Sequence, residues 1–305
     1  MLVKRLLEDA GLMMFIGIIV ALLLPQQAAQ MKDLIIPLFM VVIGLSMRKT
    51  FQFSKTRAFK IDLGSIINAL FINYVVLGAV LVLLGMIFLN DPEYWPGLIA
   101  LIAVPVPASL ITFAFVMNAD LKYSFLGEVA SYLVSIAVIP VVFLLGLGQA
   151  VDVSSLVPVV LLLIVVPLVV SYFTRTRVAK TLDASAKAVT GFFLFFIVYI
   201  SIGLNYDFIV TQFVSLWPIV AMMIAKVVLL GFGVLFLANK FLGVDKKRAI
   251  GYALFASTKN AGMAVTLSLV LLGNKALLVP LISGVIDILF VAVFAKVALN
   301  KKMLM

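Results

Sequence analysis

Long apolar runs constrain this chain more than any other feature, because several continue without a charged residue for the length of a membrane-crossing helix. Such a helix needs roughly 20 apolar residues. With 65% hydrophobic residues in a chain of 305, the sequence has enough apolar residues for about ten of them. The runs do not alternate with polar residues, as the strands of an outer-membrane barrel would. The sequence therefore predicts an all-α polytopic membrane protein with ten transmembrane helices.

The positions of the apolar runs set the expected helix bounds. The expected spans are 11–25, 33–47, 61–89, 95–117, 122–148, 155–173, 188–204, 212–241, 249–272 and 276–299. The chain has no His and no Cys, which argues against haem, iron–sulfur and most zinc or copper sites. It also lacks a phosphate-binding glycine motif and a carboxylate cluster on one helix face. We expect no cofactor, no metal site and no enzymatic activity.

The net charge of +10 is explained by the distribution of basic residues between the two sides of the membrane. If the N-terminus lies inside, only Lys32 and Lys275 fall in outer loops, as the positive-inside rule requires. This predicts an inner (plasma) membrane protein with both termini in the cytoplasm and no nucleic-acid partner. A cleaved signal peptide is the alternative for the first apolar run. The inner basic residues are Lys4, Arg5, Arg48, Lys49, Lys55, Arg57, Lys60, Lys122, Arg175, Arg177, Lys180, Lys187, Lys240, Lys246, Lys247, Arg248, Lys296, Lys301 and Lys302.

The chain divides near residue 150 into two halves with matching patterns, 1–150 and 151–305. Pro105 and Pro107 interrupt the fourth expected helix near its centre, and a polar hexad at 257–262 interrupts the ninth at a similar depth. Each half has a short pair of spans, a long third, an interrupted fourth and an uninterrupted fifth. Five spans is an odd number, so the halves would enter the membrane from opposite sides. The pattern predicts an inverted repeat, as in many transporters.

The interruptions predict a binding region, because broken helices expose backbone groups that must be satisfied by protein, water or solute. Half-helix ends also carry partial charges, positive at the N-terminus and negative at the C-terminus. Simple proline kinks and hydrogen bonds between helices are the alternative interpretation. Candidate residues of this region are Pro105, Pro107, Ser109, Thr112, Ser124, Ser257, Thr258, Asn260, Gly262, Asn68 and Asn73.

Four ionisable side chains fall inside expected spans: Glu128, Lys226, Lys259 and Asp287. A bare charge at mid-bilayer costs roughly 2.5–3.5 kcal/mol, so these charges should be paired or neutralised. The natural pairs are Lys259 with Glu128 and Lys226 with Asp287, although the sequence does not fix the pairing. Purely structural ion pairs are the alternative. We expect Lys259 to be the functional switch, either as a fixed ammonium or as a protonatable group.

Three segments resemble the bile acid:sodium symporter family, part of the bile/arsenite/riboflavin transporter superfamily and related to auxin efflux carriers. They are residues 36–53, 104–140 and 259–263. The resemblance implies ten helices in two inverted five-helix repeats. It implies a panel over 11–47 and 155–204 beside a core over 61–148 and 212–299. Discontinuous helices 4 and 9 would cross in the core, and the core would shift against the panel in alternating access.

Departures from the family pattern concern its sodium ligands. The positions of these ligands are occupied by Leu110, Ile111, Phe255, Lys259 and Glu128, and only Ser124 matches. The resemblance therefore implies a sodium-independent carrier in which Lys259 replaces bound sodium. A small organic anion is the expected solute, and a proton is a candidate coupling partner. A cation/proton antiporter or an ion channel is the alternative function; the solute, the transport direction and the oligomeric state stay open.

Overall fold

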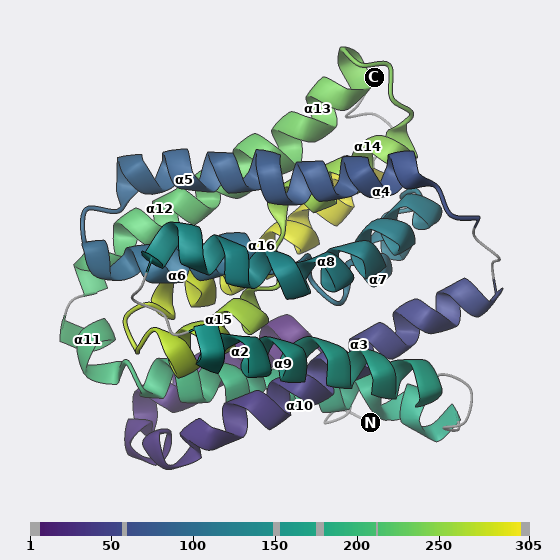
Figure 1. Ribbon diagram of the computed structural model, residues 1–305. Coiled ribbons are helices and arrows are strands. Elements are labelled where there is room, and N and C mark those ends of the chain that lie inside the picture. The colour runs from purple at the N-terminus through teal and green to yellow at the C-terminus, as the bar shows by residue number, and fades with distance from the viewer. Residues whose placement is uncertain (1–6, 57–59, 149–152, 175–179, 212, 300–305) are drawn as a thin grey trace.

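The computed structural model describes residues 7–56, 60–148, 153–174, 180–211 and 213–299, and all regular secondary structure in these ranges is helical (Figure 1). Within them, eight helices are long and apolar enough to cross a membrane, and a shorter apolar helix covers Leu12–Leu23. The prediction of a polytopic α-helical membrane protein is therefore confirmed. The following basic residues of the expected inner face lie outside the described ranges: Lys4, Arg5, Arg57, Arg175, Arg177, Lys301 and Lys302.

Four helices pack against one another in what we call the small layer, in the lower part of Figure 1. Two of them are longer than expected. The second helix of the layer begins at Ile35 and continues to Thr56, beyond the expected end at 47. The fourth helix begins at Lys180, before the expected start at 188. Hydropathy detects only the apolar part of a helix, whereas the backbone stays helical into a basic segment. The layer comprises α2 (Ala10–Leu23), α3 (Ile35–Thr56), α9 (Val153–Thr174) and α10 (Lys180–Gly203).

The other long helices form the large layer. Its first members are α4 (Leu63–Leu70), α5 (Leu77–Phe88), α6 (Trp95–Ala103), α7 (Leu110–Val116) and α8 (Leu121–Leu147). Its second members are α12 (Trp217–Lys226), α13 (Gly233–Lys240), α14 (Lys246–Ser257), α15 (Ala261–Leu271) and α16 (Leu278–Leu299). Short connecting helices are η1 (Pro25–Gln27), η2 (Ala29–Leu34), η4 (Pro92–Tyr94), α11 (Tyr206–Thr211) and η6 (Phe213–Leu216).

Two long helices of the large layer contain a π-helical segment at equivalent places. The segment η3 (Phe71–Val76) joins α4 to α5, and η7 (Val227–Phe232) joins α12 to α13. Both are six residues long, and their first residues, 71 and 227, are 156 positions apart. Wide turns of this kind are rare and are frequently found at functional sites.

Both expected helix interruptions are present in the large layer. The fourth span ends at Ala103 and resumes at Leu110, and the ninth ends at Ser257 and resumes at Ala261. Pro105 and Pro107 explain the first interruption, since neither has an N–H to donate along the helix. In the second, Thr258 is extended, with φ −120° and ψ 141°, and Asn260 begins the new helix.

Candidate functional site

The two interruptions meet, and Asn260 joins them. Its backbone N–H donates to the carbonyl of Pro105 at 2.8 Å. Its side-chain oxygen accepts from the Met263 N–H at 3.1 Å, which caps α15, and its amide nitrogen contacts the Tyr132 hydroxyl. An Asn at this position satisfies backbone groups that a broken helix leaves open. We call the contact between the two interruptions the crossing.

Lys259 lies in the crossing with its side chain 1% exposed. Its Nζ donates to the carbonyls of Ile102 and Val104, at 2.8 and 2.9 Å, and to the Asn73 side-chain oxygen at 2.9 Å. The two carbonyls belong to the C-terminal end of α6, where the helix dipole is negative. The ammonium also lies 4.3 Å from the centroid of the Tyr74 ring, a cation–π contact. The Lys259 amine thus satisfies the carbonyl end of a half-helix.

Glu128 is fully buried in α8 and its two carboxylate oxygens have different partners. One accepts from the Thr50 hydroxyl at 3.1 Å, and the other from the Ile111 N–H at 2.8 Å. Among the described residues it has no salt-bridge partner. The predicted Lys259–Glu128 pair is therefore wrong. Lys259 reaches the negative end of α6, whereas Glu128 reaches the positive first turn of α7, so each charge is placed against a helix end.

The second predicted pair is confirmed. Lys226 Nζ lies 2.5 Å from an Asp287 carboxylate oxygen, and its side chain is fully buried. The same ammonium donates to the Ser283 hydroxyl at 2.9 Å. This pair joins α12 to α16, and the backbone N–H of Lys259 is also directed towards Asp287.

Asn73 lies in the π segment η3 and connects that helix to the crossing. Its side-chain nitrogen donates to the carbonyls of Phe255 and Thr258, at 2.9 and 3.3 Å, at the end of α14. Its oxygen accepts from Lys259. One amide therefore satisfies the carbonyls of one half-helix end and the ammonium that neutralises the other.

A cavity of about 290 Å³ lies between the two layers, beside the crossing. Phe39 and Leu194 line it from the small layer, and Ser109, Thr258 and Asp287 line it from the large layer. Most of the wall is apolar, with a few polar groups, which is the usual composition of a small-molecule site.

Gly262 also lines the cavity, and its role differs from the expected one. It lies inside α15 and not in the interruption. A Cβ there would lie 2.2 Å from Cε2 of Phe39. The missing side chain thus allows α3 to approach α15 closely.

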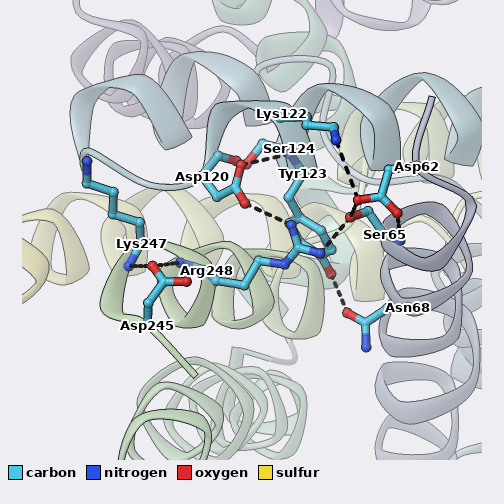
Figure 2. A network of polar contacts seen from close by, with 10 residues as sticks. All are labelled: Asp62, Ser65, Asn68, Asp120, Lys122, Tyr123, Ser124, Asp245, Lys247 and Arg248. Carbon is cyan, nitrogen blue, oxygen red and sulfur yellow. Dashed lines mark hydrogen bonds and ion pairs between the residues drawn. The ribbon is translucent and has the colours of Figure 1, made fainter. Parts of the chain in front are cut away.

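Several candidate residues are not among the groups that join the two interruptions. The Asn68 oxygen accepts from the Tyr123 hydroxyl, and Ser124 donates to the Asp120 carbonyl (Figure 2). The Ser257 hydroxyl donates to a carbonyl of its own helix, that of Ala253. Thr112 lies within α7, half-buried.

A second polar cluster, which sequence reasoning missed, joins the start of α14 to α4 and α8 (Figure 2). Arg248 donates to Asp120 at 2.8 Å and to the Ser65 hydroxyl at 2.6 Å, and its guanidinium lies 4.1 Å from the centroid of the Tyr123 ring. Asp245 caps α14 and Asp62 caps α4. The charge pattern predicts only a topological role for Arg248, and its position three residues after the capping Asp245 is the local signal for a contact at the start of α14.

Comparison with known proteins finds one matching family. A search of curated proteins finds no match to the chain. A sequence model described as the Sodium Bile acid symporter family matches residues 37–216, which is 180 of the 305 residues and includes Glu128, the α6–α7 interruption and three helices of the small layer in whole or part. The chain therefore belongs to the sodium bile acid symporter family, whose members are membrane transporters and not enzymes.

Proposed function

We propose that this protein is a secondary active transporter that moves a small organic anion by alternating access without sodium. In this proposal the Lys259 ammonium takes the place of a bound sodium ion. The small layer is the panel, the large layer is the core, and α6–α7 and α14–α15 are the crossed discontinuous helices. The protein lies in the inner (plasma) membrane with both termini in the cytoplasm.

The ligands of Lys259 are the observation that carries this proposal. Two backbone carbonyls and one amide oxygen surround the ammonium at 2.8–2.9 Å. Carbonyl and amide oxygens next to a helix C-terminus are also the groups that coordinate sodium in transporters with broken helices. A covalently attached cation that occupies this position leaves no vacancy for a mobile one.

Two further observations support alternating access. The cavity lies between the layers, so that a movement of one layer against the other would change the side from which the solute can enter. The paired π segments and the paired interruptions support an internal repeat, because they recur at offsets of 156 residues (71 and 227) and 154 residues (103 and 257), and five spans in each half would make that repeat inverted.

The charges beside the cavity support an anionic solute. Lys226 and Asp287 cancel within their own pair. The start of α15, including Gly262, lines the cavity and brings the positive end of that helix dipole to it. Lys259 also lines the cavity, and its ammonium has no carboxylate among its hydrogen-bond partners.

Transport by purified protein in proteoliposomes tests the proposal. The probes are radiolabelled benzoate, malate, taurocholate and indole-3-acetate, each measured with an inward sodium gradient and with choline in its place. We expect uptake of at least one acid above protein-free liposomes, with equal initial rates in the two salts. Uptake that requires sodium would refute the role of Lys259, and sodium uptake or release without any acid would favour an ion antiporter or channel.

A further inference from the structure

Among the described residues of the large layer, Glu128 is a buried carboxylate with no salt-bridge partner, whereas the buried carboxylate of Asp287 is paired with Lys226. The Glu128 side chain is fully buried, and its two partners, the Thr50 hydroxyl and the Ile111 N–H, are both uncharged. An ionised carboxylate in such a place costs far more than a neutral one unless a cation accompanies it. Binding a proton removes that cost without any change of fold.

Within the described ranges, no cationic side chain forms a salt bridge with Glu128. The helices α4, α6 and α7 that pack against α8 carry no ionisable side chains. Lys259 is held by its own three oxygens, and Arg48 on α3 donates to the Thr174 carbonyl. The other described ionisable side chains on α8 and on adjacent elements are Lys49, Tyr74, Lys122, Tyr123, Tyr132, Tyr172, Lys246, Lys247, Tyr252, Arg248 with Asp120, and Lys226 with Asp287.

The Thr50 contact connects the carboxylate to the other layer. Thr50 belongs to α3 of the small layer, whereas Glu128 belongs to α8 of the large layer. Their hydrogen bond must break when the two layers move against each other, because one partner lies on each. The movement that opens the cavity would therefore also change the environment of Glu128.

We propose that Glu128 carries the coupling proton of this transporter. It takes one proton from water on one side of the membrane when the Thr50 contact is open and releases it on the other side. This inference rests on the proposed function, to which it adds the coupling ion and the residue that binds it.

Charge balance then couples the proton to the solute. With Glu128 ionised, the four buried charges described in the large layer, Lys226, Lys259, Glu128 and Asp287, sum to zero. With Glu128 protonated, the sum is one positive charge, which favours an anion in the cavity. By linkage, the bound anion favours protonation of Glu128 to the same extent.

Infrared difference spectroscopy of the protein in lipid nanodiscs tests the assignment without a solute. The carboxylic acid C=O band is followed between roughly pH 5 and 9, the range in which buried carboxylic acids titrate. We expect a titrating band in the wild type that is absent from Glu128→Gln and unchanged in Asp62→Asn, an acid-to-amide control outside the cavity. Thr50→Val removes the hydroxyl that donates a hydrogen bond to the ionised Glu128 carboxylate. The titration midpoint of the Glu128 band should therefore rise by about one pH unit or more.

The outcomes separate this inference from the proposed function. A titrating band that persists in Glu128→Gln, or the absence of any titrating band in the wild type, overturns the assignment. If Glu128→Gln does not fold, a band whose midpoint is unmoved in Thr50→Val overturns it as well. A second experiment measures the uptake of taurocholate and malate into proteoliposomes, with pyranine inside them to report proton entry. Acid uptake without proton entry refutes the inference and leaves the transporter intact, whereas a Glu128 band with no acid uptake refutes the organic-anion function.

Discussion

Replacing Lys259 with alanine should turn a fixed charge into a vacant cation site. The substitution removes the ammonium and most of the side-chain stem but leaves the carbonyls of Ile102 and Val104 and the Asn73 oxygen in place. Three buried oxygens then face a space about the size of the removed chain. A monovalent cation from solution would satisfy them, which no cation can do while the lysine is present.

The loss of stability expected for Lys259→Ala, and the part that sodium restores, follow from the contacts that are lost. An unsatisfied buried acceptor costs about 1–3 kcal/mol, and three such acceptors, partly relieved by water, amount to about 3–5 kcal/mol. If sodium binds the vacant site with a Kd of about 10 mM, then about 100 mM sodium restores about 1.4 kcal/mol. At about 2–4 °C per kcal/mol for a chain of this size, the expected rise in Tm is about 3–6 °C.

Thermal unfolding in detergent provides the assay, with sodium chloride compared with choline chloride at equal ionic strength. Lys259→Met is the matched control, because methionine fills most of the lysine volume without a charge and leaves no room for an ion. Propylammonium chloride is the positive control, since that cation equals the part removed in Lys259→Ala. We expect sodium to raise the Tm of Lys259→Ala alone.

Two results would refute this reasoning. If wild-type protein gains as much from sodium as Lys259→Ala does, the lysine does not occupy a cation site. If propylammonium stabilises Lys259→Ala and sodium does not, the vacancy is accessible but its oxygens do not coordinate a metal ion, and Lys259 has no sodium-replacing role.

Three further substitutions test other contacts. Arg248→Ala removes two hydrogen bonds from a partly exposed side chain, so thermal or urea unfolding should show a loss of about 1–2 kcal/mol, and Arg248→Lys should restore part of it. Gly262→Ala places a Cβ against Phe39 and should cost about 1–3 kcal/mol, most of which a second change, Phe39→Ala, should recover in a double-mutant cycle. Hydrogen bonds from Ser65 hold the pKa of Asp62 below its ordinary value of 3.8, so its contribution is complete above about pH 4 and is lost as the pH falls. Asp62→Asn should therefore flatten the acid side of a Tm–pH profile.

The sequence predicted the features that depend on composition along one segment. Apolar runs located the long helices, and Pro105, Pro107 and the polar hexad located both interruptions. The Lys226–Asp287 pair was predictable because two opposite charges in apolar segments have few alternatives to each other. Each of these inferences needs only the local residues and the cost of burying a charge in hydrocarbon.

Other features depend on geometry that the sequence does not show. The partner of Lys259 is the partial charge of a helix end, and its position depends on where α6 stops. Asn68 and Asn73 were both candidates, but Asn68 contacts Tyr123 whereas Asn73 contacts Lys259, and the sequence does not show that a π segment begins between them and changes the helical phase. Thr50 lies three residues beyond the expected end of its helix, and no local pattern places its hydroxyl against Glu128, 78 residues later in the chain.

The groups proposed for coupling are also the groups that make the interruptions of the large layer stable. Lys259 satisfies the carbonyl end of α6, Glu128 accepts from the first turn of α7, and Asn73 satisfies the end of α14. A broken helix buried without such partners would leave several backbone groups unsatisfied. Loss of activity in a variant at any of these positions therefore does not by itself show a coupling role, since loss of fold predicts the same result. Sodium rescue of Lys259→Ala and the infrared titration of Glu128 are informative because instability alone predicts neither.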